Sequence, residues 1–250
     1  MSENSKFNAA ILIIGNEILS GRTQDTNTST LATWLNSLGV KVLEVRVIPD
    51  IEEIIISSVN LLRKQYSYVF TSGGIGPTHD DITSESVSKA FQLPYEIHKE
   101  GYKILEAYYK SGEFNDGRQK MIWMPRGAKL ILNPTSGAPG FYVDNVFVLP
   151  GVPSILKSML GGLKNKIVGG NPIISHTISL RTFESHIAES LTSVQNKYQK
   201  VEIGSYPFFQ AGKLGVSIVI RSDDKKLIDK CILDIMSFVE EKKIEVVERD

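Results

Sequence analysis

A glycine-rich segment with two adjacent aspartates is the part of this sequence best suited to chemistry. It runs from Thr71 to Thr83 and reads TSGGIGPTHDDIT. Its three glycines let backbone amides come close to an anion, and the helix predicted to follow adds the positive end of its dipole. These glycines are Gly73, Gly74 and Gly76. Asp80 and Asp81 would repel a phosphate held there unless a divalent cation lay between them.

The segment therefore predicts that phosphate and a hard metal such as Mg²⁺ bind together. Successive residues of an extended chain point in opposite directions, so we expect only one of the two aspartates to reach the metal directly. His79 is a candidate proton donor or phosphate contact, with a solvated loop side chain as the alternative. In the alternative interpretation of the whole segment, the glycines only form a turn while Asp81 and Thr83 cap the helix. The paired aspartates between a strand and a helix favour the functional interpretation.

Two further polar segments are predicted to lie at the same edge of the sheet. Asp50 follows the second predicted strand, and residues 15–27 follow the first. Because the carboxyl ends of neighbouring parallel strands lie close together, Asp50 is placed to share a cation with Asp81. Capping the next helix is an equally good explanation of its position. Residues 15–27 contribute three polar side chains where the chain needs only a turn: Glu17, Arg22 and Asn27.

Several common active-site motifs are missing from the sequence. The glycine-rich segment lacks the Gly-Lys-Ser/Thr of a Walker loop, and its glycine spacing does not fit a dinucleotide-binding fingerprint. There is no Gly-x-Ser-x-Gly elbow and no His-Glu-x-x-His. Cys231, the single cysteine, lies among leucines and isoleucines of a predicted helix, which indicates a core position rather than a nucleophile.

The elements that must position these residues alternate between strand and helix over the first two-thirds of the chain. We expect strands at 9–14, 40–47, 66–71 and 143–149. We expect helices at 31–38, 51–64, 84–91, 102–109 and 154–163. Gly39 suits a helix C-terminus, Pro153 suits a first helical turn, and residues 133–140 have the composition of a loop. This order predicts an α/β domain, a mostly parallel sheet with helices on both faces.

The composition changes at residues 168–172, which predicts a linker. We therefore expect a main domain over residues 1–168 and a small domain over residues 172–250. In the small domain we predict strands at 176–181, 201–206, 214–221 and 244–247, with helices at 184–198 and 225–241. The order β-α-β-β-α-β is the split βαβ pattern of ferredoxin-like folds.

Composition and charge limit the classes of function. The chain has 250 residues, of which 42% are apolar, so a core can form. Lys and Arg together number 28, and Asp and Glu together also number 28. This balance of charge argues against a general nucleic-acid binder, which needs an excess of Lys and Arg. The apolar run at residues 9–14 is too short for a signal peptide or a membrane span. We expect a cytoplasmic protein that binds neither nucleic acid nor membrane.

The same segments carry a family resemblance. Residues 15–27, 48–50 and 72–83 resemble the molybdopterin-binding-like domain of the MoaB/Mog type. The resemblance is greatest to the N-terminal domains of the competence/damage-inducible CinA proteins and of eukaryotic FAD synthases. Arg118-Gln119-Lys120 and residues 134–141 and 149–153 extend it through the first domain. It implies a three-layer α/β/α domain followed by a small α/β domain.

The resemblance also implies two chemistries. In Mog-type enzymes the positions of Asp50 and Asp81 serve metal-assisted adenylyl transfer to molybdopterin. In the CinA and FAD synthase branches the domain is linked to hydrolysis of a nucleotide pyrophosphate such as ADP-ribose or FAD. Our leading hypothesis is this hydrolysis, with release of AMP and with Mg²⁺, Mn²⁺ or Co²⁺ as cofactor. A third hypothesis is a pterin- or nucleotide-binding module without chemistry.

The hypothesis assigns roles to named residues. Asp81 holds the cation, Asp50 is a second ligand or the base for water, and Asp80 is a further candidate ligand. The residues expected to bind substrate are Gly15, Glu17, Arg22, Asn27, Ser72, Gly73, Gly74, Gly76, Thr78, Arg118, Lys120, Pro150 and Gly151. Among these, Arg22, Arg118 or Lys120 would neutralise the bridging oxygen, while Glu17 and Asn27 would meet the ribose or base.

The chain also departs from the family pattern. The charged residue common after Pro153 is replaced by Ser154-Ile155, and the entry to the small domain's first helix reads Thr182-Phe183-Glu184-Ser185. This sequence does not continue into the nicotinamide-nucleotide amidase domain usual in CinA proteins or into the adenylylating domain of FAD synthases. It also has no molybdenum insertion domain, so adenylyl transfer to molybdopterin would need a separate partner. The habit of the family implies a homo-oligomer.

Overall fold

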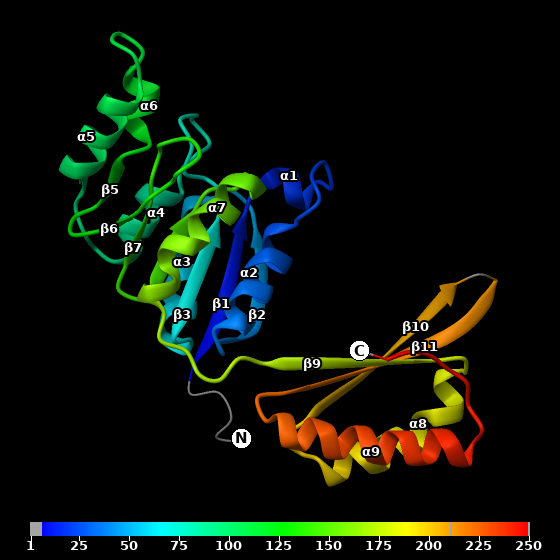
Figure 1. The fold of residues 1–250 in the computed structure, drawn as a ribbon. Helices are drawn as coiled ribbons and strands as arrows, with labels where there is room; N and C mark the ends of the chain where they lie inside the picture. The colour runs from blue at the N-terminus through cyan, green and yellow to red at the C-terminus, as the bar shows by residue number, and fades with distance from the viewer. Residues whose placement is uncertain (1–6, 211, 250) are drawn as a thin grey trace. The chain divides into compact units, whose positions relative to one another are not determined.

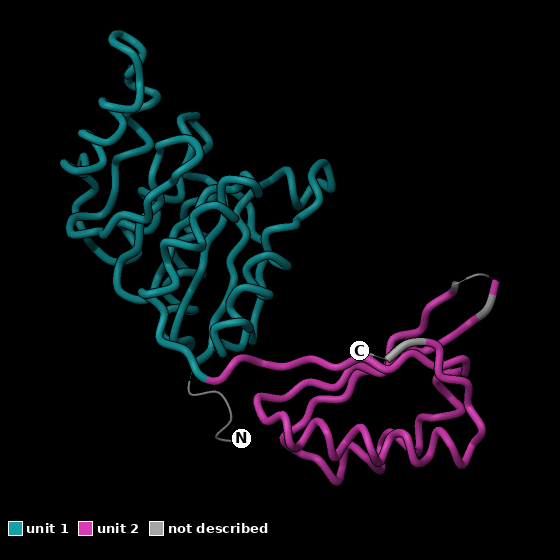
Figure 2. Tube along the Cα trace, in the orientation of Figure 1, with its two compact units in different colours: residues 1–170 teal, residues 171–250 magenta. Residues whose placement is uncertain are grey.

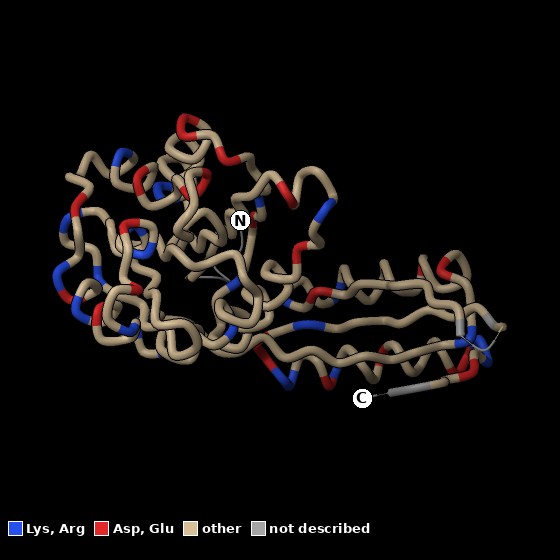
Figure 3. Tube along the Cα trace, turned by 90° about the horizontal axis from the view of Figure 1, so that it is seen from above, with Lys and Arg blue, Asp and Glu red and all other residues tan. Residues whose placement is uncertain are grey.

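The chain folds into two compact units. The computed structural model describes residues 7–210 and 212–249. Unit 1 is Met1–Gly170 and unit 2 is Asn171–Asp250 (Figure 2). Basic and acidic residues are interspersed along both units (Figure 3). None of the helices in the described ranges is both long and apolar enough to cross a bilayer.

Unit 1 is built on a six-stranded sheet in the order β2-β1-β3-β8-β7-β6. The first four strands are parallel to one another, and β7 and β6 are antiparallel to their neighbours. The strands are β1 (Asn8–Ile14), β2 (Lys41–Ile48), β3 (Tyr68–Ser72), β6 (Lys129–Ile131), β7 (Gly140–Val143) and β8 (Val146–Leu149). A separate ribbon pairs β4 (Tyr95–Ile97) with β5 (Trp123–Pro125).

Strand β1 lies inside the sheet because its side chains are apolar on both faces. Its odd-numbered residues from Ala9 to Ile13 pack in one core cluster with helices α2 and α7. Its even-numbered residues from Ala10 to Ile14 pack in a second cluster with α3 and α4. These helices are α2 (Asn27–Ser37), α3 (Glu52–Gln65), α4 (Thr83–Ala90) and α7 (Pro153–Leu163). Unit 1 therefore has the predicted three layers of helix, mostly parallel sheet and helix (Figure 1).

Most predicted boundaries differ from the observed ones by only a few residues, and the strand expected at 143–149 is found as β8 but begins later. Residues 143–149 do not form a single strand, because the chain reverses between Val143 and Val146 to pair β7 with β8. Asp144 makes this turn with a positive φ of 51°. Its short polar side chain tolerates the left-handed conformation better than most residues do.

The short elements of unit 1 were not predicted. They are α1 (Asn16–Leu19), α6 (Asp116–Lys120) and the 3₁₀ turn η1 (Lys164–Lys166), together with β4, β5 and β6. Helix α5 (Lys99–Tyr108) confirms the helix expected at 102–109 but begins three residues earlier. His98 caps it, since its Nδ1 accepts a hydrogen bond from the Gly101 amide at 3.2 Å. Histidine is not among the residues that usually signal a helix start.

Unit 2 has the predicted β-α-β-β-α-β order. Its four strands form an antiparallel sheet in the order β10-β11-β9-β12. The elements are β9 (Ile174–Leu180), α8 (Glu184–Lys197), β10 (Glu202–Gln210), β11 (Lys213–Ser222), α9 (Lys225–Glu241) and β12 (Val246–Arg249). Residues of the sheet and of both helices share one apolar core, which includes Cys231. This is the ferredoxin-like arrangement expected for a small second unit.

Candidate functional site

The carboxyl ends of the parallel strands in unit 1 surround one cavity of about 550 Å³. Residues that follow β1, β2, β3 and β8 line it, together with parts of the 133–140 loop and Met121. Ligand sites in open α/β sheets lie at this edge. The volume falls within the range of small-molecule pockets, which is roughly 300–1,000 Å³.

Asp50 reaches the cavity from the end of β2, and a backbone contact fixes its side chain. Its Oδ2 accepts a hydrogen bond from the Asn16 amide at 2.9 Å, and the Gly15 amide donates to the Ile48 carbonyl at 3.1 Å. The alternative role as a helix cap is wrong, because α3 has Ile51 as its N-cap and no side-chain cap bond. Asp50 therefore joins the ends of β1 and β2.

Asp81 is held by its own loop. Its Oδ2 accepts hydrogen bonds from the Thr78 amide at 2.8 Å and from the Thr78 hydroxyl at 2.6 Å. A Cβ on Gly76 would lie 2.6 Å from the same Oδ2, so only glycine lets the chain pass this close to the carboxylate. Capping of α4 by Asp81 or Thr83 is also wrong, since the N-cap is Ile82 without a side-chain bond.

The glycine-rich loop offers amides to the cavity, but fewer than expected. The Gly73 amide donates to the Leu149 carbonyl at 3.1 Å, so it serves the fold. Among the described residues, the amides of Gly74, Ile75 and Gly76 have no backbone acceptor. Gly73 has a φ of 109°, and a Cβ there would lie 2.1 Å from the Ile14 carbonyl oxygen. The loop therefore needs glycine where it crosses the end of β1.

Acidic side chains dominate the electrostatics of the cavity. Four of the described residues that line it are acidic and none is Lys or Arg; the four are Glu17, Asp50, Asp80 and Asp81. Hydrogen bonds from Thr78 and from its own backbone amide hold the pKa of Asp80 below its ordinary value, so this carboxyl is ionised at neutral pH. Asp80 is 66% exposed and His79 is 99% exposed. These carboxylates would repel a phosphate in the cavity unless a cation lay between them.

The donor set fits a hard divalent cation that keeps several ligands from substrate or water. Carboxylate oxygens of Asp50 and Asp81 are the ligand type that Mg²⁺ prefers, and Mg²⁺ is usually held by one or two carboxylates plus phosphate oxygens. No group of three or more His, Cys, Asp or Glu side chains in the described ranges is arranged to hold a metal without such help.

Most of the predicted site residues line the cavity, but Arg22, Thr78, Arg118 and Lys120 are not among the lining residues. Lining it are Gly15, Glu17, Asp50, Gly73, Gly74, Gly76, Asp80, Asp81, Pro150 and Gly151. Asn27 and Ser72 line an adjoining hollow of about 50 Å³. There the Asn27 side-chain amide donates to the Ser72 hydroxyl at 2.9 Å and to the Gly151 carbonyl at 2.7 Å. Asn27 thus holds the ends of β3 and β8 together with the start of α2.

The predicted basic residues are not among those that line the cavity. Arg22 is exposed on the loop after α1. The Arg118 guanidinium lies 4.0 Å from the centre of the Tyr109 ring and donates to the Glu113 carbonyl. Lys120 donates to the Thr78 carbonyl. Lys120 therefore supports the loop that carries Asp80 and Asp81.

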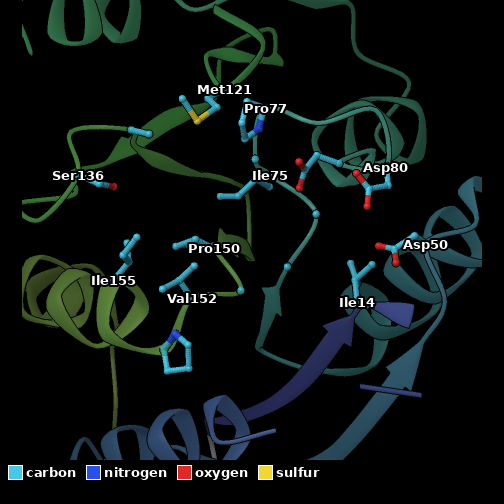
Figure 4. Close-up of a pocket in the computed structure, with 18 of the residues that line it drawn as sticks. Ile14, Asp50, Ile75, Pro77, Asp80, Met121, Ser136, Pro150, Val152 and Ile155 are labelled. Atoms are coloured by element: carbon cyan, nitrogen blue, oxygen red, sulfur yellow. The ribbon is translucent and has the colours of Figure 1, made fainter. Parts of the chain in front are cut away.

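Sequence reasoning missed the apolar side of the cavity. Figure 4 shows Ile155, Val152 and Pro150 on one side of the hollow and Asp50 and Asp80 on the other. Of the three apolar residues, only Pro150 was predicted as a site residue. The lining residues without an assignment are Ile14, Thr23, Ile75, Pro77, Met121, Asn133, Ser136, Ala138, Pro139, Val152, Pro153 and Ile155. In a sequence, apolar residues such as Ile155 and Met121 are indistinguishable from core residues.

Two family models match the chain. Residues 10–169 match the model described as "Probable molybdopterin binding domain". The chain belongs to this family. Residues 172–248 of the same chain match the model described as "FAD synthase, middle domain". The two matches confirm the resemblance to MoaB/Mog-type domains and to FAD synthases.

Relatives of this member of the molybdopterin-binding family cover nearly its whole length. A protein of Archaeoglobus fulgidus is 32% identical over 93% of this chain and 98% of its own. A protein of Sulfolobus acidocaldarius is 33% identical over 91% of this chain and 92% of its own. The solved structure of the protein CinA from Thermoplasma acidophilum is 30% identical, with a TM-score of 0.60. It covers 64% of this chain and 99% of the CinA chain.

Proposed function

We propose that the protein hydrolyses a nucleotide diphosphate of the FAD or ADP-ribose class, with a divalent cation, and releases AMP. The observation that carries the proposal is that Asp50 and Asp81, which lie on different strand ends, line one cavity with the free amides of the glycine-rich loop. The match of unit 2 to a FAD synthase domain supports a substrate of this class.

In the proposed reaction, water attacks the phosphorus of the adenylate half. The bond from this phosphorus to the bridging oxygen breaks, and the bridging oxygen leaves with the other phosphate, which takes up a proton. The adenylate half, which now carries the oxygen of the water, is the AMP product. Asp50 accepts the proton of the attacking water, because its other oxygen is fixed by Asn16 and its orientation is therefore set. The amides of Gly74 to Gly76 donate to the phosphate oxygens.

The divalent cation would be held by Asp81, with Asp50 or Asp80 as a second ligand. When bound, it supplies positive charge to the diphosphate oxygens, a task for which the described cavity lining has no Lys or Arg. In this proposal the cation takes the role that the sequence analysis gave to Arg22, Arg118 or Lys120.

The experiment is an assay for AMP. Purified protein is incubated with FAD or ADP-ribose and Mg²⁺, Mn²⁺ or Co²⁺, and the products are separated by chromatography. We expect AMP with at least one metal and none after chelation by EDTA. Release of AMP that is unchanged in Asp81→Asn, or no AMP with any metal, would refute the proposal.

A second candidate is adenylyl transfer to molybdopterin, which the description of the matching family favours. Incubation with ATP, Mg²⁺ and molybdopterin would then give an adenylylated pterin, which mass spectrometry detects. If calorimetry shows tight binding of intact ligand while both assays are silent, the binding-module hypothesis takes its place.

The proposal carries two further expectations. A cytoplasmic location would supply both nucleotide diphosphate and Mg²⁺. A homo-oligomer is expected from the resemblance to the family, and light scattering after size-exclusion chromatography measures its mass.

A further inference from the structure

The cavity has an apolar side that the diphosphate chemistry does not use. Pro150 and Val152 of the β8–α7 loop contribute to it, as do Ile155 of α7, Met121 and Pro139. Val152 is 52% exposed although the core of α7 begins only four residues later, at Leu156. Apolar surface left exposed inside a ligand-sized cavity marks a binding surface.

Hydrogen bonds and packing fix this apolar side relative to the end of β3. The Ser72 hydroxyl donates to the Pro150 carbonyl at 3.3 Å, and the Asn27 side chain donates to the Gly151 carbonyl at 2.7 Å. Leu156 and Met159 of α7 are fully buried against the sheet. The positions of Val152 and Ile155 are therefore set before any ligand binds.

The chemistry around these two residues selects a flat, uncharged ring. All four acidic residues of the lining belong to the segments that follow β1, β2 and β3. The polar residues that the 133–140 loop adds to the lining, Asn133 and Ser136, are neutral. The Asn133 side chain is hydrogen-bonded within the loop, so the Ser136 hydroxyl is the group that can still donate to a ligand. A heteroaromatic ring places its apolar face on aliphatic side chains and its edge on such a neutral group. A sugar in the same place would lose hydrogen bonds to water without replacing them.

We propose that Val152 and Ile155 bind the face of a heteroaromatic ring at the end of the diphosphate opposite the adenylate half, and that Ile155 determines specificity for such rings over a terminal sugar. The specificity part of this inference rests on the proposed function, because it concerns hydrolysis of a nucleotide diphosphate. The ring-binding part does not, because binding can be measured without hydrolysis. The expected preference is at least about tenfold in kcat/KM for FAD over ADP-ribose, the range that a hydrophobic pocket achieves.

The first experiment measures ring binding alone. Riboflavin, which has the ring but no phosphate, is titrated with protein, and quenching of its fluorescence is followed. Ile155→Glu places a charge on the apolar side, whereas Ser154→Glu adds the same charge to an exposed neighbour that is not in the cavity lining. We expect Ile155→Glu to weaken riboflavin binding at least about tenfold and Ser154→Glu to leave it unchanged.

The second experiment compares kcat/KM for FAD and ADP-ribose in the same proteins. Ile155→Glu should remove the preference for FAD while AMP release from ADP-ribose continues. Equal riboflavin binding by the two glutamate variants, or no binding by the unmodified protein, would overturn the inference. If no substrate yields AMP, the proposed function is refuted, but the riboflavin titration still tests the ring site.

If Ile155→Glu lowers the melting temperature, Val152→Glu takes its place in both experiments, because Val152 is half-exposed and tolerates a charge better.

Discussion

The Asp50 carboxylate accepts a hydrogen bond of 2.9 Å from the backbone amide of Asn16, 34 residues earlier in the chain. This bond fixes one oxygen of the side chain at the end of β1 and leaves the other oxygen for chemistry. Asp81 is fixed in a similar way, because Thr78 donates twice to its Oδ2. Both carboxylates therefore have a set orientation before a ligand enters.

We predict that Asp50→Asn lowers kcat for AMP release by about 10²–10⁴-fold, the usual contribution of a general base. We predict that Asp81→Asn lowers it as well, because the substitution removes the negative charge proposed to hold the cation. Asparagine keeps an oxygen that can accept from Thr78 or Asn16, so the fold should persist while the charge is lost. Steady-state kinetics of AMP release measures the effect. Asp229→Asn, on the exposed surface of α9, is the matched control and should change kcat by less than about twofold. An equal loss in all three variants would contradict the assignment.

Two glycine-to-alanine changes should act on different properties: Gly76→Ala on activity and Gly161→Ala on stability. Gly76→Ala places a methyl group 2.6 Å from Asp81 Oδ2 and should displace the carboxylate, so AMP release should fall at least about tenfold. Gly161 lies in α7, and a Cβ added there would meet no atom within 4 Å outside its own helix backbone. Gly161→Ala should therefore raise the free energy of unfolding by about 0.5–1 kcal/mol. Activity assays and urea titrations of both variants check the pair. Full activity in Gly76→Ala would contradict the claim that AMP release depends on the position of the Asp81 carboxylate.

Removal of the Asn27 side chain should loosen the cavity edge. Asn27→Ala leaves the Ser72 hydroxyl and the Gly151 carbonyl without their donor, and Asn27 is 6% exposed. We expect a loss of about 1–3 kcal/mol in the free energy of unfolding. Urea denaturation measures this, with Thr33→Ala on the exposed side of the same helix as the control. A loss below about 0.5 kcal/mol would mean that the two contacts do not stabilise the fold.

The buried Cys231 should make stability depend on alkaline pH. Burial raises the pKa of its thiol from 9.0 to about 11. The folded state therefore favours the neutral thiol, and this contribution is complete below pH 9 and is lost as the pH rises towards 11. Urea titrations between pH 8 and pH 11 should show a decline in stability that Cys231→Ala reduces. At pH 8, iodoacetamide should modify the thiol only after unfolding, and rapid labelling of the folded protein would contradict its burial.

The fold could be predicted where burial leaves a pattern in the sequence. The apolar run of β1 signals a strand covered on both faces, and Leu31 and Leu35 recur at helical spacing in α2. The β7–β8 hairpin escaped prediction because only Asp144 and Asn145 interrupt the apolar residues of the two strands. Short elements such as α6 escaped it because they contribute few residues to any core.

The candidate site could be predicted only in part. The polar residues after the strand ends, such as Asp50 and Asp81, were identified and line one cavity. Arg118 was assigned to the substrate, yet a stacking contact with Tyr109 and a bond to Glu113 hold it elsewhere. Ile155 was missed as a site residue because only the tertiary structure shows that it faces a cavity.

The sequence by itself determined the three-layer unit, the ferredoxin-like second unit and the membership of the molybdopterin-binding family. Each depends on local periodicity or on motifs that are contiguous in the chain. The tertiary structure decided which groups remain available for a ligand. It committed the Gly73 amide to Leu149 and Asn27 to Gly151, and it placed Ile155 opposite the carboxylates. The physical reason is that these contacts join residues distant in sequence, and their geometry is set only when the strands pack side by side.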